Sequence, residues 1–205
     1  MQIKKNILVL IIGALSYNTS AQYNKTDPNF KECFIGSSLF MLGNLDSENK
    51  PDFLQLNLGY RITNKDVVSI EVKTWKYTQP LGIPFGKEFT NPLNKFPGAI
   101  REKGFAIAYQ RFLYKGFYTA IHVMSAWQSF ENPKGVETDK GFQIFNTYRL
   151  GYHFKIPKTR FFIEPSIAIT HRPYHTQMPY EFRVLDNQHS KLFFGEPGLH
   201  FGYNF

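Results

Sequence analysis

The residues best suited to catalysis gather in the last quarter of the chain. They are His171, His175, Glu181, Asp186, His189 and Ser190. A serine, a histidine and a carboxylate are the groups of nucleophilic hydrolysis. His189 and Ser190 are adjacent, however, and neighbours on a strand point to opposite faces. The residues therefore raise a hydrolase hypothesis without forming a known hydrolase motif.

A metal site is not predicted from the same histidines. Two histidines four residues apart bind one metal ion when they share a helical face, but Pro173 lies between His171 and His175 and disfavours a helix. Cys33 is the only cysteine, so the chain has neither a cysteine cluster nor an internal disulfide. We predict no metal and no cofactor.

A second group of polar residues alternates with apolar residues along segments that look like β-strands. Its ionisable members are Arg61, Glu71, Lys73, Arg149, His153, Glu164, Glu196 and His200. If these side chains share an enclosed interior, their charges must be paired, because an isolated buried ion is very costly. Glu71 is expected to pair with Lys73, and Arg149 with Glu164 or Glu196. Such a network either fills the interior as a plug, or lines a gated polar path or a small-ligand pocket at one mouth.

The elements that would position these residues are strands, most clearly the last fifteen residues. The first alternate set is largely apolar and consists of Phe193, Gly195, Pro197, Leu199, Phe201, Tyr203 and Phe205. The other set is small or polar except for its first member and consists of Phe194, Glu196, Gly198, His200, Gly202 and Asn204. A period of two predicts a strand with each face in a different environment. This strand resembles the closing strand of outer-membrane barrels, and the resemblance implies that Phe201, Tyr203 and Phe205 serve membrane insertion.

Seven further segments precede this closing strand. We place them at residues 33–42, 54–61, 67–77, 104–110, 119–128, 142–156 and 161–170. The turns at 63–66, 115–116 and 157–159 are short, whereas the connections at 44–52, 80–101, 131–140 and 173–190 are long. Short turns on one side and long loops on the other are typical of membrane barrels. The sequence predicts an all-β fold, a closed antiparallel eight-stranded transmembrane β-barrel; a soluble lipocalin-type barrel would need a polar outer face.

The amino-terminal segment predicts export. Lys4 and Lys5 precede an apolar run at residues 7–15, and Ser20-Ala21 is a plausible cleavage site. We therefore expect a signal peptide at 1–21, a periplasmic lead-in at 22–32 and the barrel at 33–205.

The formal net charge of +8 does not predict nucleic-acid binding, because the basic residues form no single stripe. Many lie in the predicted loops, namely Lys87, Lys95, Arg101, Lys134, Lys140, Arg172 and Arg183. We expect this basic rim to face anionic lipid headgroups or simply solvent.

The closing sequence Gly198-Leu199-His200-Phe201-Gly202-Tyr203-Asn204-Phe205, together with the strand pattern, resembles that of small eight-stranded outer-membrane barrels. These families include OmpX-like and OmpW-like barrels and the transmembrane part of OmpA-like proteins; the amino-terminal style resembles that of Bacteroidota proteins. The resemblance implies a Gram-negative outer membrane, periplasmic termini, and contact with outer-membrane lipids including lipopolysaccharide. It also implies insertion by the barrel-assembly machinery.

The same resemblance implies two aromatic girdles. Tyr60, Tyr152, Tyr203 and Phe205 would form the periplasmic one, and Trp75 and Trp127 the outer one.

Three functions remain open from the sequence. The leading expectation is a non-enzymatic structural or interaction barrel whose basic outer loops contact lipid headgroups or an unknown protein partner. One alternative is a lipid A-modifying hydrolase or acyltransferase that uses His171, His175, His189 or Ser190. The other is a narrow, porin-like solute channel.

Overall fold

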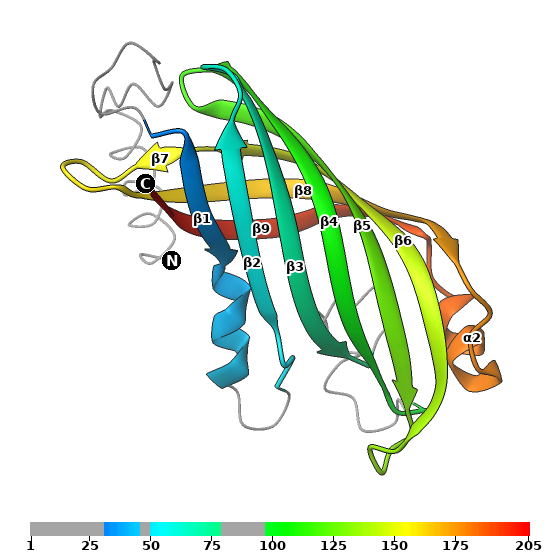
Figure 1. Ribbon diagram of the computed structural model, residues 1–205. Coiled ribbons are helices and arrows are strands. Elements are labelled where there is room, and N and C mark those ends of the chain that lie inside the picture. Colours follow the sequence, from blue (N-terminus) through cyan, green and yellow to red (C-terminus); the bar gives the residue numbers. More distant parts are fainter. Residues whose placement is uncertain (1–30, 46–49, 79–96) are drawn as a thin grey trace, which may run out of the picture.

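The computed structural model describes residues 31–45, 50–78 and 97–205, most of which form one antiparallel β-sheet (Figure 1). The strands are β1 (Cys33–Ser38), β2 (Leu54–Arg61), β3 (Asp66–Tyr77), β4 (Ala99–Tyr114), β5 (Phe117–Glu131), β6 (Glu137–Tyr152), β7 (Phe154–Lys155), β8 (Phe161–His175) and β9 (Leu192–Asn204). A 3₁₀ helix, η1 (Leu39–Leu45), follows β1, and a short α-helix, α2 (Tyr180–Asp186), precedes β9.

Several sequence predictions fall outside the described residues. These are the signal peptide at 1–21, nearly all of the lead-in at 22–32, and most of the connection at 80–101. Within the described part of the chain, no helix is both long enough and apolar enough to cross a membrane.

The sheet closes into a ring of eight strands. Consecutive strands pair with each other, and β1 pairs with β9 to complete the ring. The two-residue strand β7 continues β6 after a break at His153, and both pair with β8. This ring confirms the predicted fold class of eight antiparallel strands.

The two ends of the barrel differ. We call the end with residues 62–65, 115–116 and 156–160 the turn end, and the opposite end, where η1 and α2 lie, the loop end (Figure 1). Lys115 and Gly116 both have positive φ angles, of 42° and 91°. Such a pair forms the tight hairpin turn whose twist matches that of the flanking strands.

Several strand boundaries differ from the sequence prediction, most clearly at the loop end. The predicted strand 33–42 stops at Ser38, where η1 begins. Half of the predicted loop 131–140 belongs to strands, since Phe130 pairs with Asp139 and Glu131 with Glu137. Backbone pairing does not require apolar side chains, so β5 and β6 extend beyond their apolar stretch. The predicted loop 173–190 likewise begins later, because β8 runs to His175, and it contains α2.

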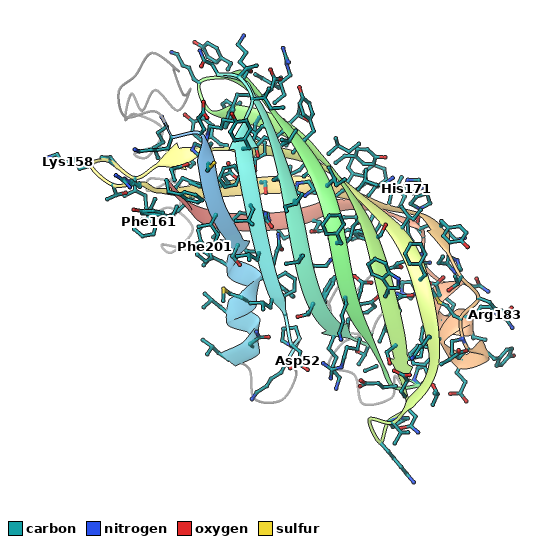
Figure 2. The ribbon with its side chains drawn as sticks, viewed as in Figure 1. Asp52, Lys158, Phe161, His171, Arg183 and Phe201 are labelled. Atoms are coloured by element: carbon teal, nitrogen blue, oxygen red, sulfur yellow. The ribbon has the colours of Figure 1, made fainter. Side chains whose placement is uncertain are left out.

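The side chains are arranged inside out relative to a soluble barrel. Large apolar side chains cover the outer face, among them Leu54, Leu56, Leu58, Ile70, Val72, Phe105, Ile107, Val123, Trp127, Leu150, Phe161, Ile167 and Leu199. Polar side chains are buried inside, among them Gln55, Arg61, Glu71, Glu102, Gln128, Gln143, Thr147, Arg149, His153 and Thr170. Figure 2 shows Phe161 projecting from the outside of the wall near the turn end.

The predicted alternation is wrong at two aromatic positions. Gly195 has a φ of 88°, and the register between β8 and β9 shifts beside it, as in a β-bulge. The bulge reverses the side-chain direction beyond it, so Phe194 is 65% exposed while Phe193 lines the interior. Trp75 faces the interior, as its alternation with Glu71 and Lys73 predicts, so its expected place in the outer girdle is wrong.

Candidate functional site

The turn end of the interior is filled by aromatic rings and one arginine. Arg61 is only 2% exposed, donates from Nη2 to Asn204 Oδ1 over 2.7 Å, and lies over the Phe34 ring. Phe34 contacts Phe162, and His153 lies between Phe162 and Phe112 with centroid distances of 4.7 and 5.5 Å. These buried rings leave the turn end of the barrel closed.

A polar layer follows above this aromatic floor. Glu164 Oε1 is hydrogen bonded to His153 Nδ1 at 2.6 Å and accepts a bond from Gln110 Nε2 at 3.2 Å. Gln110 and Glu164 belong to β4 and β8, so this bond ties opposite walls of the barrel together.

Arg149 occupies the middle of the interior. Its Nη1 donates to Ser166 Oγ over 2.8 Å, and its Nη2 lies 3.6 Å from Glu196 Oε1. Of the two partners expected for Arg149, the structure places Glu196 beside it and Glu164 beside His153. Gly198 makes room for the guanidinium, since a Cβ at this position would lie 2.1 Å from Arg149 Nη1.

We therefore expect Gly198→Ala to displace Arg149 and to lower the free energy of unfolding by about 1–3 kcal/mol, as overpacking usually does. Gly104→Ala is the matched control, because its new Cβ would meet the flexible Met124 side chain. Urea midpoints of the two refolded variants measure the difference. Equal urea midpoints would show that Arg149 does not need the space left by Gly198.

In the structure, Glu71 and Lys73 do not form the expected ion pair with each other but have other partners. Lys73 Nζ lies 3.7 Å from Glu102 Oε1, and Glu71 Oε2 lies 3.4 Å from His122 Nδ1. The second pair spans β4, where the intervening inward residues are Ala106 and Ala108. Small residues on the middle strand allow side chains two strands apart to meet, so nearest-neighbour pairing was the wrong assumption.

The loop end is closed by a second set of contacts. Tyr77 Oη donates to Glu102 Oε2 over 3.0 Å and accepts from Gln128 Nε2 over 2.8 Å. Above them, Phe182 of α2 packs on Phe130 with a centroid distance of 5.0 Å. The helix is anchored by a second contact, a buried ion pair of 2.5 Å between Arg172 and Asp186. Arg172 is thus part of the interior and not of a basic rim.

Between the two closed ends lies a cavity of about 140 Å³. Its aromatic lining comprises Phe40, Phe53, Trp75, Phe145 and Phe193, and its ionisable lining comprises Glu71, Lys73, His122, Arg149, Glu196 and His200. The cavity therefore has both apolar and hydrogen-bonding walls.

The structure does not assemble the residues proposed for hydrolysis. His171 points away from the barrel (Figure 2), on the outward set of β8. His175 Nδ1 is bonded to the Thr176 carbonyl and His189 Nδ1 to the Leu185 carbonyl, while Ser190 Oγ accepts from the Leu192 amide. These are local contacts with the backbone, so each of these side chains stabilises the segment in which it lies.

Besides Arg172, which was assigned to the basic rim, three interior ionisable residues were missed from the sequence. Glu102 continues the alternating inward set of β4 but lay between the predicted loop 80–101 and the predicted strand 104–110. His122 shares its face with Ala120 and Met124 and carried the same alternation signal. Asp186 had no such signal, because α2 was not predicted.

The closing strand pairs as a barrel strand must. Tyr203 pairs with Ile35, Phe201 with Ser37, and the Phe205 amide donates to the Cys33 carbonyl over 3.0 Å.

In the described ranges, no group of three or more His, Cys, Asp or Glu side chains could hold a metal ion. Comparison with protein-family models, curated proteins and solved structures finds no match for the chain.

Proposed function

We propose that the chain is an integral outer-membrane β-barrel with a structural or interaction role, of the small eight-stranded kind that its closing strand resembles. The observation that carries this proposal is the distribution of side chains. Large apolar side chains cover the outside of the barrel, and paired charges lie inside it. In water such an outer face would be an aggregation hazard, whereas in a bilayer it is the stable arrangement. Where the ring is closed, backbone groups are paired between strands and do not meet hydrocarbon unpaired.

The turn end would face the periplasm and the loop end the outside. The short turns of the turn end support this orientation, because outer-membrane barrels have short turns on the periplasmic side. Exposed aromatic residues near the turn end fit a membrane interface there. Tyr60 and Phe205 are exposed there, and Phe161 packs on Tyr203 with a centroid distance of 5.1 Å. Aromatic girdles of this kind mark membrane–water interfaces.

The interaction role is proposed for the loop end. Lys134 and Lys140 are exposed there and could meet lipopolysaccharide phosphates or a protein partner. Insertion would depend on the barrel-assembly machinery, as for other outer-membrane barrels of this form.

The buried floor and the α2 contacts favour this role over a solute channel. Arg61, Phe112, Tyr118 and His153 are almost fully buried at the turn end, and Phe130 and Phe182 are buried at the loop end. A water-filled path would expose such side chains.

We expect the full-length protein to sediment with the outer membrane, to resist carbonate extraction, and to produce no conductance steps in planar bilayers. Recovery in the soluble periplasmic fraction without detergent would overturn the membrane proposal. Discrete, reproducible conductance steps would instead restore the channel hypothesis.

The lipid A-modifying alternative has its own measurement, since it predicts a change in acyl pattern. We expect lipid A from cells with and without the protein to give the same mass spectrum. A difference that His189→Ala or Ser190→Ala abolishes would make the protein an enzyme.

A further inference from the structure

The wall of the barrel is incomplete where β1 ends. β1 pairs with β9 only as far as Ser38, which lies opposite His200. Beyond this point, among the described residues, β9 residues 192–199 pair only with β8, and β2 residues 54–56 only with β3. Pro197, which has no amide hydrogen, and the bulge at Gly195 are features of a strand edge. We call this break in the wall the seam.

Helix η1 lies at the seam but is attached to one side of it. Asn44 Nδ2 donates to the Phe53 carbonyl over 2.8 Å, and Asn44 Oδ1 accepts from the Phe53 amide over 2.9 Å. Ser37 Oγ donates to the Gln55 carbonyl over 2.6 Å. These bonds tie η1 and its approach to Phe53 and β2. Helix η1 also packs against β9, but among the described residues no hydrogen bond joins η1 to β9. The boundary between η1 and β9 is therefore closed by packing alone.

The outer surface beside this boundary is apolar. Leu42 and Leu45 of η1 are exposed on one side, and Phe194 and Leu199 of β9 are exposed on the other. Exposed apolar side chains around an opening suit contact with hydrocarbon rather than with water.

The cavity lies directly behind the seam. Its lining takes Phe40 and Phe53 from the η1–β2 side and Phe193 and Pro197 from the β9 side. Phe40, Phe53 and Trp75 pack edge to face, with centroid distances of 4.8 Å for Phe40–Phe53 and 5.8 Å for Phe40–Trp75. A volume of about 140 Å³ is close to that of a cavity known to hold benzene.

The inner wall of the cavity presents hydrogen-bond donors that the protein does not fully use. Arg149 Nη2 and Lys73 Nζ lie 3.6 and 3.7 Å from their carboxylate partners, beyond good hydrogen-bond distance. Buried donors normally find a close acceptor, so these two loosely paired cations can donate to an acceptor inside the cavity.

We propose that this cavity binds the headgroup end of a single hydrocarbon chain with an oxygen-acceptor headgroup. The ligand enters sideways through the seam between η1 and β9, and the rest of its chain remains outside the cavity. The chain would pack among Phe40, Phe53 and Trp75, and the headgroup oxygen would accept from Arg149. A free fatty acid and an acyl chain of a membrane lipid share this chemistry. The entry of a lipid chain from a bilayer rests on the proposed membrane location, whereas the binding of a free fatty acid does not.

The two tryptophans of the chain allow a direct test. Trp75 lines the cavity, whereas Trp127 is exposed on the outer wall. Bromine atoms on a hydrocarbon chain quench tryptophan fluorescence at short range. In the Trp127→Phe variant, held in lipid nanodiscs, we expect a fatty acid brominated along its chain to quench Trp75 with saturation. In the matched Trp75→Phe variant, quenching of Trp127 should rise with bulk concentration and not saturate.

A second arm distinguishes the two sources of the chain. Nanodiscs are made from phospholipid brominated in its acyl chains, with no free fatty acid added. Quenching of Trp75 that Thr147→Phe removes by filling the cavity assigns the ligand to a lipid chain. Saturable quenching by the free acid alone assigns it to a fatty acid.

A separate variant tests the contact between Arg149 and the headgroup, in case Thr147→Phe fails to fold. Arg149→Gln combined with Glu196→Gln removes the ion pair without leaving one charge alone. We expect this double variant to bind the brominated acid about tenfold more weakly and the matching brominated alcohol equally well. Each variant is compared only if it keeps the shifted gel mobility of a folded barrel.

The proposal is overturned if Trp75 is quenched in neither arm, since the cavity then holds only water. That result in a protein that sediments with the membrane leaves the proposed function intact. Conversely, recovery in the soluble fraction would overturn the proposed function while saturable quenching of Trp75 could still be observed.

Discussion

Ile107→Arg is expected to lower the free energy of unfolding in lipid vesicles by about 2–4 kcal/mol, as a basic residue at the bilayer midplane does. Ile107 lies at the centre of β4, is 61% exposed, and pairs with Ile70 and Val123 on the outer face. If hydrocarbon surrounds this face, the arginine must be buried in it or distort the bilayer. Urea unfolding of the refolded protein in vesicles measures the loss.

The control for this substitution is Val136→Arg. Val136 is 58% exposed, close to the value for Ile107, but it lies in the hairpin between β5 and β6 at the loop end. We expect its stability to change by no more than about 0.5 kcal/mol, because surface substitutions in water are usually that mild. Equal, small effects at both positions would mean that water surrounds the whole outer face, contrary to the proposed function.

Glu102→Ala is expected to lower the free energy of unfolding by about 3–5 kcal/mol, the range for breaking a buried pair from one side. Glu102 is buried and holds three partners at once: Lys73 at 3.7 Å, the Tyr77 hydroxyl at 3.0 Å, and the Gln143 amide. Its loss leaves the Lys73 ammonium beside the Trp75 and Phe145 rings without its ion-pair partner. Unfolding in urea, monitored by tryptophan fluorescence, gives the value.

Two further variants identify the cause of that loss. Combining Glu102→Leu with Lys73→Met removes both charges, so we expect it to recover at least half of the lost stability. Glu137→Ala removes a carboxylate from an exposed ion pair with Lys140 and should leave the midpoint unchanged within error. If the paired variant is no more stable than Glu102→Ala, the uncompensated Lys73 charge is not the cause.

Side chains fill the interior of the barrel except for the one cavity described above, among the residues that the structure describes. Hydrogen bonds across the barrel, such as Gln110 to Glu164, and stacked rings at both ends hold the strands together. The cavity next to the seam is where the packing is left open. A barrel built this way can be rigid and still admit a ligand from the side.

The sequence by itself determined the number of strands, their antiparallel order and, for most strands, which face is apolar. These properties follow from a period of two and from the lengths of the connections, and both are local. The inward placement of Arg61, Arg149 and His200 followed from the same alternation.

Only the tertiary structure decided which inward charges meet. Glu71 contacts His122 across Ala106 and Ala108, and such a contact depends on residue size on a strand that the pair does not share. Alternation along one strand carries no information on this.

The tertiary structure also decided where alternation fails and where the wall opens. The bulge at Gly195 exchanges the directions of Phe193 and Phe194. The end of β1 at Ser38 depends on how far β9 and β2 remain within pairing distance of it. The cavity and its seam arise from this mismatch in strand length, because a gap in a barrel belongs to several strands together and is not encoded in any one of them.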